Sequence, residues 1–276
     1  MTLPNNRVRW MLGAAALICL ITSPVLAQRR FSSESWNRDC NRDGNRDTER
    51  FCMVSESTIA SPGGSLTIDG RTNGGVSVFG SSRRDVLIRA RIQASARTEE
   101  RAEEIAREIR IRSDGGRIYA AGPETGRREW WSVSYEVEVP SRSNLDLRAM
   151  NGGISVVDVS GVLRLETMNG GIHLEAVSGD VVAETTNGGM NVLLDGDRWQ
   201  GKGLDAVTTN GGVRVRIPDG YSAHLETGTV NGGIDIDFPV TVQGRIGRRV
   251  TTDLGRGGAT IRVITTNGGV VIRRSE

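Results

Sequence analysis

The chain has 276 residues, of which 35 are Lys or Arg, 33 are Asp or Glu and 36 are Gly. This near balance of charge excludes the strongly basic surface that characterises most nucleic-acid-binding domains. His173 and His224 are the only histidines and lie far in sequence from the three cysteines, which argues against a cysteine–histidine metal centre.

The first 27 residues predict a signal peptide. Arg7 and Arg9 give a positive start, an apolar run follows from Trp10 to Val25, and Ala27 ends a site of the kind that a signal peptidase recognises. The run is too short to span a membrane comfortably. Cleavage after Ala27 would remove two of the 35 basic residues and none of the 33 acidic ones. We therefore expect an exported protein, periplasmic or secreted, without a transmembrane span or nucleic-acid partner.

Residues 28–57 predict a polar arm of low complexity, because an Asn-Arg-Asp triplet recurs there every four residues. Cys40 and Cys52 are the two cysteines that remain after export. In an oxidising compartment they are expected to form a disulfide, which would close a loop of about 13 residues and contribute roughly 3 kcal/mol at most.

A calcium loop is a second interpretation of this arm. Four oxygen-bearing residues match positions 1, 3, 5 and 9 of an EF-hand loop: Asp39, Asn41, Asp43 and Asp47. Arg50 stands where the loop needs a bidentate glutamate, and no flanking helix is evident. A polar linker tied by the disulfide is the simpler interpretation. We therefore expect no cofactor, with calcium kept as the alternative.

From residue 58 to 276 apolar and polar residues alternate with a period of two, which predicts strands. One segment departs from this pattern. Residues 98–110 place Ala102 and Ile105 at helical spacing, Thr98 can cap, and glutamates fill the first turn. We expect one amphipathic helix here, inserted between strands and covering an edge or an open end of their assembly.

The motif that organises the chain is Asn-Gly-Gly, which occurs seven times. The copies begin at Asn73, Asn151, Asn169, Asn187, Asn210, Asn231 and Asn267. Each copy separates two alternating runs, and the copies between residues 151 and 231 are 18 to 23 residues apart. Such a repeat indicates a stacked architecture, in which each Asn-Gly-Gly turn joins two strands.

Two stacked architectures fit this repeat. Ordinary hairpins would give an antiparallel barrel or meander. Equivalent positions keep the same residue class from copy to copy, however, which favours parallel rungs stacked like on like. The predicted fold class is therefore all-β: a parallel β-solenoid, or β-helix, of two-strand rungs of about 18–23 residues over residues 58–276, with the one inserted α-helix.

The alternation also predicts which way the side chains point. Each Asn has the parity of the apolar positions before it, so we expect it to point inward, where stacked amides can bond to one another. The glycines would supply backbone angles that a Cβ opposes. In this register Asp146 lies beside Arg164, Arg148 lies beside Glu166, and Glu184 also lies beside Glu166.

The residue before each Asn should face outward, and together these residues form a mildly apolar stripe. Its members are Met150, Met168, Thr186, Thr209 and Val230. The stripe could dock a partner, extend an assembly, order water on its threonines, or be covered by a neighbouring loop. Partner docking is our functional hypothesis.

Parallel β-solenoids include carbohydrate lyases and hydrolases, whose active sites need carboxylates that converge on one face. The acidic candidates are Asp195 and Asp197, in a loop over residues 195–203, and Asp235 and Asp237, which share a strand face. No Ser-His-Asp arrangement, phosphate loop or metal-ligand spacing is present in the sequence. We therefore expect no enzymatic activity.

The alternative is a carbohydrate-active enzyme or carbohydrate-binding module that uses the 195–203 loop and Trp130-Trp131. Adjacent tryptophans on a strand point to opposite faces, so one can be in the core while the other is exposed and stacks on a sugar.

Two longer motifs carry a family resemblance. Val137-Glu138-Val139-Pro140 is followed by Leu-x-Leu-x-x-Met-Asn-Gly-Gly-Ile-x-Val, and the chain ends with Ile-x-Val-x-Thr-x-Asn-Gly-Gly-Val-x-Ile at residues 261–272. Over residues 58–276 the sequence resembles the bacterial β-strand-repeat "putative adhesin" domain of unknown function. The resemblance implies an exported β-solenoid that presents a surface to a protein or glycan of the cell envelope. It supplies no catalytic or binding residues.

Overall fold

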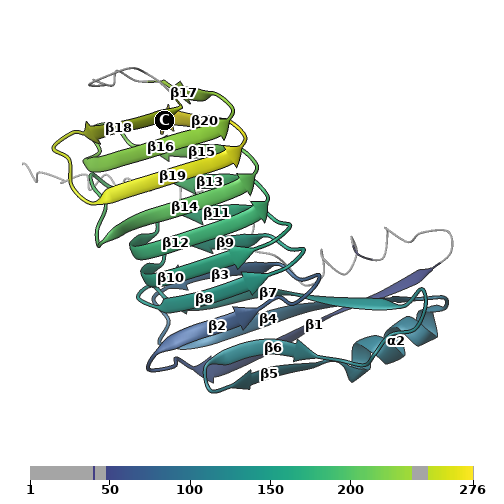
Figure 1. The fold of residues 1–276 in the computed structure, drawn as a ribbon. Helices are drawn as coiled ribbons and strands as arrows, with labels where there is room; N and C mark the ends of the chain where they lie inside the picture. The colour runs from purple at the N-terminus through teal and green to yellow at the C-terminus, as the bar shows by residue number, and fades with distance from the viewer. Residues whose placement is uncertain (1–39, 41–47, 238–247, 276) are drawn as a thin grey trace, which may run out of the picture. The chain divides into compact units, whose positions relative to one another are not determined.

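The computed structural model describes residue 40 and residues 48–237 and 248–275 (Figure 1). All of them belong to one compact unit, Ser33–Glu276. The expected signal peptide, 1–27, and the calcium candidates Asp39, Asn41, Asp43 and Asp47 lie outside the described residues. No helix in the described part of the chain is long and apolar enough to cross a membrane.

The strands form two sheets, and the helix α2 spans Glu99–Glu108. In spatial order, sheet 1 contains β1 (Glu49–Ala60), β4 (Asp85–Ala96), β7 (Trp130–Pro140), β3 (Val76–Ser81), β9 (Ile154–Val157), β11 (Ile172–Glu175), β13 (Met190–Leu193), β15 (Val213–Ile217), β20 (Val270–Arg274) and β17 (Ile234–Ile236). Sheet 2 contains β18 (Arg249–Leu254), β16 (Ala223–Asn231), β19 (Thr260–Asn267), β14 (Gly203–Asn210), β12 (Ser178–Asn187), β10 (Ser160–Thr167), β8 (Asn144–Ala149), β2 (Ser65–Asp69), β6 (Arg117–Ala121) and β5 (Arg110–Asp114).

Each Asn-Gly-Gly turn carries the chain from a strand of sheet 2 to a strand of sheet 1, so that one rung contributes to both sheets (Figure 1). Neighbouring rungs pair in parallel, with like residues opposite each other: Leu163 lies between Leu145 and Val181. These inward side chains are buried, and they form a thin aliphatic core. The predicted all-β solenoid of parallel rungs is confirmed.

The rungs do not stack in chain order at either end. The last rung in the sequence, β19–β20, lies between β14–β15 and β16–β17. At the other end, β6 and β7 pair with the outer side of β2–β3, whose other side pairs with β8–β9. Antiparallel strands extend the sheets further. At this end β4 and then β1 follow β7 in sheet 1, and β5 follows β6 in sheet 2. At the opposite end β18 pairs with β16 in sheet 2.

The predicted helix is confirmed as α2. The Thr98 hydroxyl accepts a hydrogen bond from the Arg101 backbone N–H at 3.3 Å, which caps the helix. Ala102 and Ile105 are buried on the face that packs against β1 and β4. The helix therefore covers the antiparallel end of sheet 1.

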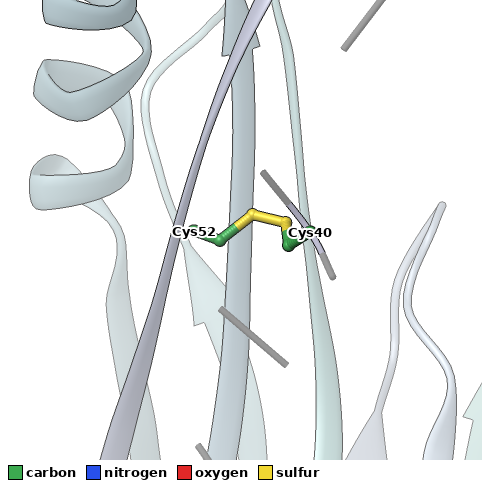
Figure 2. The surroundings of a disulfide bond; sticks show 2 residues. All are labelled: Cys40 and Cys52. Atoms are coloured by element: carbon green, nitrogen blue, oxygen red, sulfur yellow. A yellow bond between two sulfur atoms is a disulfide. The ribbon is translucent and has the colours of Figure 1, made fainter. Parts of the chain in front are cut away.

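The Cys40–Cys52 disulfide fastens Cys40 to β1 (Figure 2). β1 begins at Glu49, within the segment expected to be a polar arm. No clear apolar alternation marks this strand, because β1 is an edge strand and Cys52 is the one buried residue among its twelve.

The predicted charge register is correct, but the ion pairs differ. Asp146 lies opposite Arg164, and Glu166 lies between Arg148 and Glu184. The Arg148 guanidinium, however, donates to Asp146 of its own strand at 3.1 Å. Residues i and i+2 share a face of a strand, so the partner on the same strand is within reach.

The prediction that the asparagines point inward was wrong: all seven are exposed. Their amides nevertheless form the expected chain, here called the Asn ladder. Asn151 Nδ2 donates to Asn73 Oδ1 at 3.1 Å, and five further bonds of 2.7 to 2.9 Å continue to Asn231. The alternation ends at the corner: β12, β14 and β16 each end at their Asn, and both the Asn and the residue before it are exposed.

The inward polar groups at the corner are the threonines two residues before Asn. They are Thr167, Thr185, Thr208, Thr229 and Thr265, and all are buried. Each hydroxyl donates to the carbonyl of the first glycine of a neighbouring rung, at 2.7 to 2.8 Å. These bonds satisfy polar groups that would otherwise be costly to bury.

The glycines of the motif are required for space. Among the described glycines, none of the Asn-Gly-Gly glycines has a positive φ, which corrects the expectation of unusual backbone angles. A Cβ on Gly170 would instead lie 2.2 Å from the carbonyl oxygen of Gly152 in the neighbouring rung. A Cβ on the second glycine, Gly171, would lie 3.1 Å from Gly189 O, which is tight but much less severe.

Gly170→Ala should therefore lower the free energy of unfolding by about 3 kcal/mol or more, because the clash is with backbone and cannot be relieved by a side-chain rotation. Gly171→Ala should cost about 1 kcal/mol or less. Denaturant unfolding of the two variants measures the difference. Equal losses would contradict the close approach of the first glycine.

Thr185→Val should lower stability by about 1–2 kcal/mol, because it removes the hydroxyl that donates to Gly170 O and leaves that carbonyl without this partner. Its neighbour Thr186 is exposed, so Thr186→Val is a matched control that should change stability by less than about 0.5 kcal/mol. Thermal unfolding of both variants tests this prediction, and a similar loss in the two would contradict it.

Candidate functional site

An open groove of about 720 Å³ lies along sheet 2 beside the Asn ladder, and we call it the corner groove. Four of the five residues of the predicted stripe line it: Met150, Met168, Thr186 and Thr209. Val230 is exposed but does not line it. Met150 is 44% exposed and Met168 is 50% exposed, so their thioethers are available to a partner. The strands β8, β10, β12 and β14 place these residues on successive rungs.

The corner groove carries two adjacent carboxylates. Glu166 and Glu184 lie opposite each other on β10 and β12, and both are exposed. Neither has an ion pair with another described residue, because the nearby Arg148 is bonded to Asp146. Like charges placed opposite each other on neighbouring strands repel. A cationic group in the groove would relieve that repulsion.

The loop over residues 195–203 packs one side chain, Trp199, into the hydrophobic core. Asp197 pairs with Arg198 at 2.8 Å, and this hydrogen bond lowers the pKa of Asp197. Trp199 is buried and donates its indole N–H to Gly179 O at 3.1 Å. Asp195 is exposed on the same loop. The loop thus places Trp199 in the core and leaves its carboxylates at the surface.

The second acidic pair takes part in strand pairing. Asp235 on β17 accepts a hydrogen bond from Arg273 on β20, and that bond lowers the pKa of Asp235. The backbone N–H of Asp237 donates to Ile272 O at 3.1 Å. A general acid at neutral pH needs a raised pKa, so Asp235 is poorly suited to that role.

Trp130 and Trp131 line a second hollow, of about 220 Å³, which we call the Trp pocket. It also contains Arg71, Asn73 and Tyr135, and lies where the Asn ladder ends. Both tryptophans are partly buried, and of the two it is Trp131 that packs against the hydrophobic core, which agrees with the expectation that they face opposite sides of the strand. Trp131 is tied by its indole N–H to a carbonyl of the loop before β7, and an arginine of β1 covers the Trp130 ring.

The Trp pocket and the 195–203 loop do not form one site. The pocket is built on β7 and the loop follows β13, with β3, β9 and β11 between these strands in sheet 1. The strands β7 and β13 are therefore four strand spacings apart, which amounts to about 19 Å. A carbohydrate site that uses both features together is therefore excluded. Sequence reasoning missed Arg71, Asn73 and Tyr135 as pocket residues; the one available signal was a tyrosine at an inward position of an otherwise aliphatic strand.

Clusters of three or more His, Cys, Asp or Glu that could hold a metal ion are absent from residues 48–237 and 248–275. The two histidines lie on different sheets. His173 contacts Glu175 at 3.2 Å on sheet 1, and His224 contacts Asp253 at 2.7 Å on sheet 2.

A family model described as Toastrack DUF4097 matches residues 55–273. The chain belongs to the Toastrack DUF4097 family. No curated protein matches it. Among solved structures, a "putative cell adhesion protein" from Clostridium sporogenes is 14% identical, covers 81% of this chain and 100% of its own, and has a TM-score of 0.47. A "putative adhesin" from Bacteroides fragilis is 9% identical, covers 82% and 97% respectively, and has a TM-score of 0.37.

Proposed function

We propose that this Toastrack-family protein is exported, has no enzymatic activity, and uses the corner groove to dock a polypeptide partner of the cell envelope. The observation that carries the proposal is the gathering of Met150, Met168, Thr186 and Thr209 along one groove on successive rungs. Parallel strands hold these side chains in a fixed row, so the surface is pre-organised for binding.

The chemistry of the groove favours a segment that combines apolar and basic residues. Methionine side chains are flexible and polarisable, and they adapt to irregular apolar partners. Glu166 and Glu184 would attract Lys or Arg of the same partner. The acidic candidates for catalysis lie elsewhere on the molecule, where Asp197 and Asp235 are each engaged by an arginine.

Export is tested on the protein produced in its own host. We expect the chain to be recovered from the periplasm or the medium with Gln28 as its first residue, because the apolar run before Ala27 directs export. Leu17→Asp combined with Leu20→Asp interrupts that run and should retain the chain in the cytoplasm with residues 1–27 attached. Cytoplasmic recovery of the unaltered full-length chain would contradict export.

Docking is tested with Met150→Asp combined with Met168→Asp, which places two charges in the groove. We expect binding of the purified protein to isolated cell envelopes to fall at least about tenfold, a loss of roughly 1.4 kcal/mol. Val162→Asp is the matched control, because Val162 lies outward on β10, is 37% exposed and does not line the groove.

The control variant should bind like the unaltered protein. Glu166→Gln combined with Glu184→Gln should reduce binding and weaken its dependence on salt, because surface attraction between charges is screened by ions. Equal binding by the unaltered protein and the methionine variant would eliminate the corner groove as the docking surface.

A further inference from the structure

We propose that the Trp pocket binds one acidic sugar unit, of the uronic acid class, with the carboxylate held by Arg71 and the ring seated against Trp130 and Trp131. Asp69, Arg71 and Thr72 line both the Trp pocket and the corner groove, whereas Trp130, Trp131 and Tyr135 line the Trp pocket and not the groove. The inference rests on an excess of unpaired hydrogen-bond donors beside aromatic surface, in a pocket whose volume suits one ring.

Arg71 supplies the positive charge. Its guanidinium has no hydrogen bond or ion pair with another described residue, and it lines the pocket. Its backbone has a φ of 51°, in the left-handed region that non-glycine residues rarely adopt. The backbone N–H donates to Asp69 Oδ1 at 2.9 Å, which holds this turn. Strained positions of this kind are concentrated at binding sites.

The one carboxylate that lines the pocket is already occupied. Asp69 accepts the Arg71 N–H through Oδ1, and it accepts the Arg117 guanidinium through Oδ2 at 3.1 Å. The pocket therefore offers a ligand mainly donors and positive charge. That balance favours a ligand rich in oxygen acceptors and carrying a negative charge.

Tyr135 supplies a buried hydroxyl. Its side chain is 1% exposed and lines the pocket, and the hydroxyl has no hydrogen-bond partner among the described residues. Burial raises the pKa of Tyr135, and the nearby Asp69 raises it further, so the hydroxyl stays protonated at physiological pH. An unsatisfied buried hydroxyl is costly. Because the hydroxyl oxygen is itself buried, a ligand oxygen would remove that cost once the side chains around it move to admit the ligand.

Asn73 supplies a third donor because it ends the Asn ladder. All six amide hydrogen bonds of the ladder run in the same direction, with each donor pointing toward the rung that contains β7. Asn73 Oδ1 accepts from Asn151, whereas Asn73 Nδ2 has no partner among the described residues. Aligned hydrogen bonds polarise one another, which strengthens the donor at the end of the chain.

The pocket is sized for one ring. Its volume of about 220 Å³ is smaller than the roughly 300–1,000 Å³ of sites for drug-sized ligands. Trp130 and Trp131 both line the pocket and are partly buried. The part of an indole ring that stays exposed there can contact the C–H face of a sugar. A free carboxylate, such as the C-terminus of a peptide, would use Arg71 but would leave the ring-contacting surface unfilled.

The ligand class is tested by titrating the full chain with glucuronate and following tryptophan fluorescence and calorimetry. Methyl glucoside, acetate and the dipeptide Ala-Ala are the comparison probes. We expect glucuronate to bind at least tenfold more tightly than each of them. Equal binding of acetate or Ala-Ala would overturn the sugar assignment, and absence of glucuronate binding would overturn the site.

The site is tested with Tyr135→Phe. This change should weaken glucuronate binding at least tenfold and leave Tm unchanged or raised, because it removes only an unpaired hydroxyl. A role in packing alone would leave the affinity unmoved. Tyr221→Phe is the control for loss of a tyrosine hydroxyl elsewhere, since the Tyr221 residue is buried but does not line the Trp pocket.

Arg71→Asn provides a second variant, since asparagine tolerates the left-handed backbone and removes the charge. It should abolish the preference for glucuronate over methyl glucoside. Unchanged affinity in both Tyr135→Phe and Arg71→Asn would overturn the proposal. The Tyr135→Phe variant should still bind cell envelopes, because Tyr135 does not line the corner groove. Loss of sugar binding with envelope binding retained would show that the two sites act separately.

Discussion

The structure depends on how closely one Asn-Gly-Gly turn approaches the next. Parallel strands on both sides of the corner fix the separation of the rungs, and at that separation the first glycine faces the backbone of the neighbouring turn. A side chain at this point would push the turns apart and break the pairing in both sheets. The register, the burial of the aliphatic core and the row of exposed side chains all follow from this contact.

The corner divides its polar groups between inside and outside. Threonine hydroxyls on the inside satisfy the glycine carbonyls, which allows the core to close without unpaired backbone groups. Asparagine amides on the outside bond only to one another along the stack. The inner row is committed to the fold, whereas the outer row has one end at Asn73, where an amide group remains available.

Local patterns in the sequence predicted the strands, the parallel pairing and the helix, because each depends on residues a few positions apart. The pairing of Arg148 with Glu166 in register is an example. The direction of the asparagines was not predictable by alternation, because the residue before the Asn and the Asn itself are both exposed at the ends of β12, β14 and β16. Likewise the glycines suggested special backbone angles, whereas the cause is a contact with another rung.

The Trp pocket illustrates what the sequence alone could not supply. Asn73 and Trp130 come together because β7 pairs with the outer side of β3, although the two residues are 57 positions apart in the chain. No periodicity marks that placement. The stripe, in contrast, was predictable, since Met150 and Met168 occupy equivalent positions of adjacent repeats.

The placement of β19–β20 between two earlier rungs has a consequence for how the chain is completed. The rungs from β8–β9 to β14–β15 can be added in the order in which they are synthesised. β16–β17 cannot join them through its native partner until residues 260–274 have arrived. A later segment thus connects the end of the stack to the earlier rungs, and a chain that stops before residue 260 leaves two rungs without their shared neighbour.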